Sequence, residues 1–184
     1  MTETSEEELG RLWVRPTASP VGPLAVFHVE VGRWEEAEGF ARRVRGLVAA
    51  GVEVSRHGDF ELDQLPEDAL PAWARGGDFS EVHRDARLRY SLHRGEEEWT
   101  AQDLLFSFDP KQRRWKWWDV TLLGGNLLQA WVDSLGEPVF ACDELRWILY
   151  LSGAHAVVGP SLLSPDLWGH ERSAGIDVES ASSG

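Results

Sequence analysis

Cysteine occurs once in this chain of 184 residues, at Cys142. A disulfide within the chain is therefore impossible, and a zinc site built from cysteines is excluded. A solitary thiol is typical of a reducing compartment, and a small buried side chain is the expected role of Cys142. The sequence also lacks glycine-rich phosphate loops, a GxSxG elbow and the histidine spacing of zinc hydrolases. We expect no cofactor and no bound metal.

Long hydrophobic runs are missing as well. A helix that crosses a membrane needs about 18 consecutive apolar residues, and the sequence has no such run. Residues 1–8 are acidic and polar, whereas a secretory signal begins with basic residues followed by an apolar stretch. Arginine supplies 16 of the 18 basic residues, a bias typical of GC-rich bacterial genomes. These features predict a protein of the bacterial cytoplasm without a membrane partner.

Positive charge is outnumbered by negative charge in this chain. Lysine and arginine number 18 against 31 aspartates and glutamates, which gives a formal net charge of −13. Such a surface repels nucleic-acid phosphates and anionic lipids, because binding to both requires clustered basic residues. It attracts a basic protein, although solubility alone also explains an acidic composition.

Tryptophan, in contrast, is abundant, with ten residues in the chain. The indole is the largest side chain and carries one N–H that needs a hydrogen-bond partner when it is buried. The enrichment therefore indicates either a core built of large flat side chains or a surface built for recognition.

Hydrophobic periodicity predicts a single α+β domain over residues 23–168. A flexible segment is expected before it, at 1–22, and a disordered tail after it, at 169–184. The two main helices are expected at about 33–50, ended by a glycine, and at about 139–152. Residues 66–75 are expected to form two short helical turns, and Ser164-Pro165 to begin another helix.

Alternating apolar residues predict the strands of this domain. Longer strands are expected at 24–31, 82–93, 98–108, 114–123 and 127–133, and shorter ones at 52–54 and 154–158. A hairpin turn at Gly124-Gly125-Asn126 joins two of them. The predicted fold is an antiparallel β-meander of four to six strands, covered on one face by the two main helices. The opposite face is expected to carry arginine, histidine and tryptophan and to be the working surface.

Six residues on that open face are candidates for binding. They are Arg87, Arg89, His93, Trp115, Trp117 and Trp131. The basic and aromatic residues at 111–118 resemble a nucleic-acid grip, in which arginines hold phosphates and rings stack on bases. The acidity of the chain argues against that function, and ordinary packing under a helix explains the same tryptophans.

Three carboxylates near the start of helix 139–152 form the alternative site: Asp133, Glu137 and Glu144. Converging carboxylates can perform general acid–base catalysis, because burial and mutual repulsion shift their pKa values. Acidic residues also favour the first turn of a helix for electrostatic reasons alone.

Two functional hypotheses follow from these observations. The first is a non-enzymatic acidic protein-binding module, such as an immunity- or antitoxin-like inhibitor of a basic protein. The alternative is a small enzyme or ligand-binding protein with a Trp-lined carboxylate cleft near residues 133–144. A deep pocket where carboxylates converge would favour the second, and a broad face would favour the first.

Overall fold

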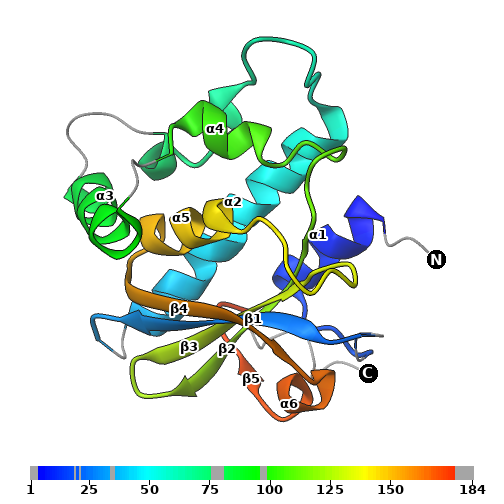
Figure 1. Ribbon diagram of the computed structural model, residues 1–184, viewed down its shortest axis with the longest axis vertical. Coiled ribbons are helices and arrows are strands. Elements are labelled where there is room, and N and C mark those ends of the chain that lie inside the picture. Colours follow the sequence, from blue (N-terminus) through cyan, green and yellow to red (C-terminus); the bar gives the residue numbers. More distant parts are fainter. Residues whose placement is uncertain are drawn as a thin grey trace, which may run out of the picture.

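The computed structural model describes residues 4–18, 20, 22–33, 36–75, 81–95 and 99–176. Their fold is α+β, with helices packed on an antiparallel sheet (Figure 1). The strands are β1 (Leu24–Val31), β2 (Lys116–Gly124), β3 (Leu127–Asp133), β4 (Ala154–Leu163) and β5 (Arg172–Ser173). Their order in the described sheet is β4-β1-β3-β2-β5. The predicted fold class, including four to six antiparallel strands, is confirmed.

The predicted hairpin is formed by β2 and β3. Gly124 and Gly125 have φ values of +133° and +57°, which residues other than glycine rarely adopt. Asn126 follows them, and its side-chain amide donates to the carbonyl of Val31 over 2.9 Å. The turn therefore also fixes the end of β1, which pairs with β3 along its length.

Helix α2 (Ala37–His57) continues beyond the glycine expected to end it. The short strand predicted at 52–54 is therefore wrong. A methyl group on Gly51 would lie 2.4 Å from the ring of Phe108, so this glycine serves close packing rather than helix termination. Val52 and Val54 are buried and extend the apolar stripe of the helix.

The strand predicted at 82–93 is also wrong, because this segment forms α3 (Glu81–Arg94). Ala86 and Tyr90, four residues apart, are buried, whereas Leu88 and Leu92 are 61% and 77% exposed. This burial follows the helical period rather than the alternation of a strand. The segment is rich in arginine, leucine and alanine, which are good helix formers.

The strand predicted at 98–108 is replaced by α4 (Ala101–Phe106). Thr100 caps this helix, and its hydroxyl and the carboxylate of Asp103 satisfy each other's backbone N–H groups in a capping box. The expected meander therefore reduces to the β2–β3 hairpin. The other strands of the sheet come from the two ends of the domain.

Both ends of the chain contribute to the fold. The segment expected to be flexible, 1–22, contains α1 (Ser5–Trp13), whose Glu8 and Leu12 are buried. The segment expected to be disordered, 169–184, supplies β5 and the buried Ala174. Its last eight residues, 177–184, lie outside the described residues.

Other expectations are confirmed. The turns at 66–75 are the 3-10 helices η2 (Glu67–Ala69) and η3 (Ala72–Ala74). The second main helix is α5 (Asp143–Leu151), somewhat shorter than expected. Ser164 caps α6 (Pro165–Gly169), with proline at its first position. No helix in the described ranges combines the length and apolar character needed to span a membrane.

Hydrophobic residues cover both faces of the sheet. The larger core lies beneath α1 to α5, which occupy one side of the sheet (Figure 1). On the other side α6 covers a smaller cluster made of Leu24, Val26, Trp118, Trp131 and Trp168. The face expected to be an open working surface is therefore partly closed.

Strand β4 lies at one edge of the sheet, and side chains bond three of its backbone groups. Arg89 donates to the carbonyl of Ala154 over 3.3 Å, and Arg146 donates to that of Gly159 over 2.8 Å. The amide of Val157 donates to the hydroxyl of Tyr150 over 3.2 Å. These bonds attach α3 and α5 to the edge of the sheet.

Candidate functional site

The three tryptophans predicted to bind a partner are core residues. Trp115, Trp117 and Trp131 are each 0% exposed. The indole N–H of Trp131 donates to the hydroxyl of Thr121 over 2.8 Å, and that of Trp115 donates to Glu144 over 2.6 Å. These rings therefore present no surface to a partner, and they serve as the large flat side chains of a core.

Arg113, one of the basic residues beside these tryptophans, is committed to structural contacts. Arg113 forms a two-pronged ion pair with the buried carboxylate of Glu8, at 2.6 and 3.0 Å, and its guanidinium lies 3.9 Å from the ring centre of Trp115. Burial lowers the pKa of Arg113, and the charge of Glu8 opposes that shift. The arrangement attaches α1 to the start of β2. It leaves no exposed ring on which a nucleic-acid base could stack.

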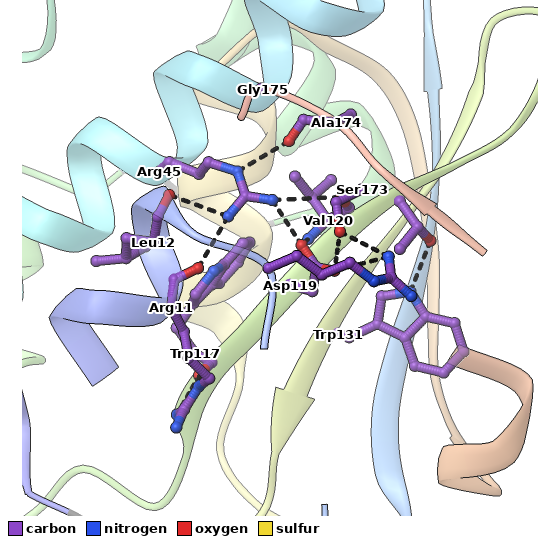
Figure 2. A network of polar contacts seen from close by, with 12 residues as sticks. Arg11, Leu12, Arg45, Trp117, Asp119, Val120, Trp131, Ser173, Ala174 and Gly175 are labelled. Carbon is purple, nitrogen blue, oxygen red and sulfur yellow. Dashed lines mark hydrogen bonds and ion pairs between the residues drawn. The ribbon is translucent and has the colours of Figure 1, made fainter. Parts of the chain in front are cut away.

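A second buried network centres on Arg45 and Asp119 (Figure 2). Arg45, in α2, donates to the carbonyls of Arg11, Leu12 and Ala174 and to Asp119 in β2. Burial is the largest influence on this guanidinium and lowers its pKa, while Asp119 opposes the effect.

The carboxylate of Asp119 also accepts hydrogen bonds from residues other than Arg45. Its Oδ2 accepts from the indole of Trp168 over 2.8 Å and from the hydroxyl of Ser173 over 2.5 Å. Its Oδ1 accepts from the amide of Val120 over 2.7 Å. With these bonds Asp119 holds α6 and the C-terminal segment against β2, so the network has a structural role.

The predicted acid cluster is not assembled. Glu144 is buried beneath Trp115, and burial raises its pKa while the hydrogen bond from that indole opposes the shift. Asp133, at the end of β3, accepts from the amide of Leu135 over 2.8 Å, and Glu137 is exposed. In the described ranges no three His, Cys, Asp or Glu side chains are placed to hold a metal ion.

A pocket does lie at the predicted junction, but with different walls. Its volume is about 360 Å³, and it is lined by residues 138–143, Arg146 and residues 160–162. Neither a tryptophan nor any of the three predicted acids lines it. Arg146 donates to Asp143 over 2.8 Å and to the sulfur of Cys142 over 3.1 Å. The guanidinium of Arg146 is thus paired with other groups of the pocket wall.

The predicted basic residues of 82–93 diverge, because that segment is a helix. Arg87 and His93 are exposed, while Arg89 is half-buried and donates to the carbonyl of Ala154. The imidazole of His93 forms a hydrogen bond with the hydroxyl of Tyr150. Arg89 lines a second pocket of about 350 Å³ between α2, α3 and the start of β4.

This second pocket, here called the α2–α3 pocket, gathers residues that the sequence pattern did not single out. Besides Arg89 and Tyr150, its walls comprise Glu36, Arg43, Trp73, Asp85, Ala86, Gly153 and His155. They come from four separate segments, so no local motif joins them. Their convergence depends on the packing of α3 against α5 and β4.

An acidic loop at residues 59–68 is the most strongly charged described surface segment. Its five carboxylates are all exposed: Asp59, Glu61, Asp63, Glu67 and Asp68. The side-chain amide of Gln102 holds the loop, because it accepts from the amide of Leu65 over 2.9 Å and donates to its carbonyl over 3.0 Å. Leu65 and Leu70 are buried beneath it. The charges therefore sit on a fixed backbone.

The charge of the acidic loop is largely uncompensated. Glu61 forms an ion pair of 2.8 Å with Lys111, and the described residues contribute no other ion pair to the loop. Leu62, in the middle of the loop, is 57% exposed. The arrangement can attract a positively charged surface and offer it one apolar contact. No protein-family model matches the chain, and no curated protein or solved structure is significantly similar to it.

Proposed function

We propose that this protein is a non-enzymatic binding module that engages a basic protein through the acidic loop. An immunity- or antitoxin-like inhibitor of a basic protein is the concrete form of this function. The observation that supports it best is the set of five exposed carboxylates on one anchored loop, of which Glu61 alone has a cationic partner within the described residues.

The loop has the physical properties that such binding requires. A backbone that is already fixed loses little conformational entropy on association, so more of the contact energy appears as affinity. Clustered charge of one sign steers an oppositely charged partner and raises the association rate, and the net charge of −13 acts in the same direction. The exposed Leu62 adds a contact that salt does not screen.

The experiment compares three forms of the full chain. In the loop variant, the five carboxylates are replaced by their amides: Asp59→Asn, Glu61→Gln, Asp63→Asn, Glu67→Gln and Asp68→Asn. In the control, five exposed acids elsewhere change in the same way: Glu30→Gln, Glu53→Gln, Glu81→Gln, Glu137→Gln and Asp166→Asn. Both variants change the net charge equally, so a difference between them reports position rather than total charge.

Immobilised wild-type protein is used to capture partners from its own cell extract at low salt. A captured protein is identified, purified and titrated against all three forms. We expect a basic protein whose association rate falls steeply with salt, that binds the control as it binds the wild type, and that binds the loop variant at least about tenfold more weakly. Equal affinity for the loop variant and the control, or capture of acidic proteins alone, would contradict the proposal.

A further inference from the structure

The α2–α3 pocket brings two guanidinium groups to one short turn. Arg43, in α2, donates from Nε to the carbonyl of Ser152 over 2.8 Å, and Arg89, in α3, donates to that of Ala154 over 3.3 Å. These carbonyls flank Gly153, which links α5 to β4. Two like charges are thus gathered from different helices around three consecutive residues.

Glycines on both sides leave room for the Arg43 guanidinium. A methyl group on Gly153 would lie 2.9 Å from Nη2, and one on Gly39 would lie 3.3 Å from Nη1. Within the described residues the hydrogen bond from Nε is the only one that Arg43 makes. Capping of the α5 C-terminus accounts for that bond, but both Nη groups keep their donors for another acceptor.

The same pocket contains negative groups close to the guanidiniums. A methyl group on Gly32 would lie 3.1 Å from Oε2 of Glu36 and 2.8 Å from Cε1 of His155, so the carboxylate and the imidazole meet at this position. Asp85 lies 3.7 Å from Arg89 on α3. With two guanidiniums and two carboxylates the pocket is formally neutral when His155 is neutral.

This charge pattern discriminates between classes of ligand. A simple anion would meet Glu36 and Asp85 as well as the arginines, and a simple cation would meet the arginines as well as the acids. A molecule with one group of each sign satisfies both. Trp73 forms a wall of the pocket, and an indole face attracts an ammonium group. The volume of about 350 Å³ is that of a small-molecule site.

We propose that the α2–α3 pocket binds a small zwitterion of the amino-acid class. The carboxylate of the ligand lies on the Nη groups of Arg43, and its ammonium lies toward Glu36 and Trp73. This function is separate from binding through the acidic loop, because the two sites share no residue.

The full chain is tested with pools of the standard protein amino acids by ligand-observed NMR. A hit is then titrated by calorimetry beside its carboxamide, which lacks the anion, and its deaminated acid, which lacks the cation. We expect at least one amino acid to bind, and each single-charge analogue to bind roughly tenfold or more weakly, because it leaves a charged group unpaired.

Variants locate the binding. Arg43→Gln and Glu36→Gln should each weaken binding of the hit by about tenfold or more, whereas Arg42→Gln, on the exposed side of the same helix, should not change it. Thermal unfolding checks that each variant is folded. If Arg43→Gln does not fold, Glu36→Gln tests the proposal, because Glu36 is exposed. The acidic-loop variant should bind the hit normally, which separates this proposal from the protein-binding function.

Three results would overturn the assignment. They are the absence of any bound amino acid, a deaminated acid or carboxamide that binds as well as the hit, and unchanged affinity in Glu36→Gln and folded Arg43→Gln.

Discussion

Nη2 of Arg45 lies 2.5 Å from Oδ1 of Asp119, and neither side chain is exposed to solvent. Around this pair meet the end of α1, the middle of α2, strand β2 and the C-terminal segment (Figure 2). A buried ion pair adds little net stability by itself, because desolvation offsets the attraction, but loss of one partner leaves an uncompensated charge.

Asp119→Ala is therefore expected to reduce the free energy of unfolding by about 3–5 kcal/mol, since it strands the Arg45 guanidinium in the core. Urea denaturation measures the change, with the exposed Glu137→Ala as control. The double variant Arg45→Met/Asp119→Leu should lose much less unfolding free energy than the sum of the losses in Arg45→Met and Asp119→Leu measured separately. Additive losses would show that the two residues do not act as a pair.

Two glycines of α2 should respond oppositely to alanine. Gly51→Ala forces a methyl group against the Phe108 ring and should cost about 1–3 kcal/mol of unfolding free energy. At Gly46 nothing lies within 4 Å of the new methyl group, so Gly46→Ala should add about 0.5–1 kcal/mol through helix propensity. Equal effects, measured by thermal or urea unfolding, would contradict the packing of α2 on Phe108.

Glu144 should make stability depend on pH. Burial raises its pKa above the ordinary value of 4.5, so the folded state holds this proton more tightly than the unfolded chain does. The contribution of Glu144 is therefore most favourable below pH 4.5 and is lost as the pH rises through the folded-state pKa. Glu144→Gln keeps an acceptor for Trp115 but removes the charge.

We accordingly expect Glu144→Gln to gain unfolding free energy relative to the wild type as the pH is raised from acid to neutral. Urea denaturation at several pH values measures the difference between the two proteins. A difference that stays constant with pH would show that Glu144 has the same proton affinity in the folded and unfolded states.

The helical assignment of 81–94 is testable by leucine truncation. Leu88→Ala and Leu92→Ala should each change stability by no more than about 0.5 kcal/mol, because both side chains face solvent. Leu104→Ala, at a buried position in α4, should cost about 2–5 kcal/mol. Had 82–93 been a strand with these leucines on its inner face, all three losses would be large.

Fluorescence quenching separates surface from core tryptophans. Trp13 is 52% exposed, whereas Trp115 and Trp117 are 0% exposed. Trp13→Phe should therefore reduce the fraction of emission that acrylamide quenches. Trp115→Phe/Trp117→Phe should leave the amount of quenchable emission unchanged, raise its share of the total because only buried emission is lost, and lower the unfolding midpoint. Loss of quenchable emission in the double variant would place these rings at the surface.

Local chemistry made part of the fold predictable. The Gly124-Gly125-Asn126 turn, the Ser164 cap and the stripe of α2 are each specified by neighbouring residues, and each is present. Segment 82–93 misled because alternate residues happened to be apolar, although its composition favours a helix. The spacing of Thr100 and Asp103 marks a capping box and could have identified α4.

The candidate sites were less predictable, for a physical reason. Glu36, Arg43 and His155 converge only after α2 and β4 are brought together, and no spacing in the sequence records that contact. The charge of Arg89 makes it a candidate in the sequence, but its location follows from a helix rather than from the predicted strand. Burial of the tryptophans likewise depends on which faces the sheet covers.

The bonded edge of β4 bears on how this protein behaves when concentrated. Open strand edges are templates on which other chains can add β-structure, and such growth leads to fibres. Here Arg89, Tyr150 and Arg146 occupy backbone groups that an incoming strand would need, and Pro160 offers no N–H. Removal of these three side chains would expose a polymerisation surface, so the residues that attach α3 and α5 also guard the protein against aggregation.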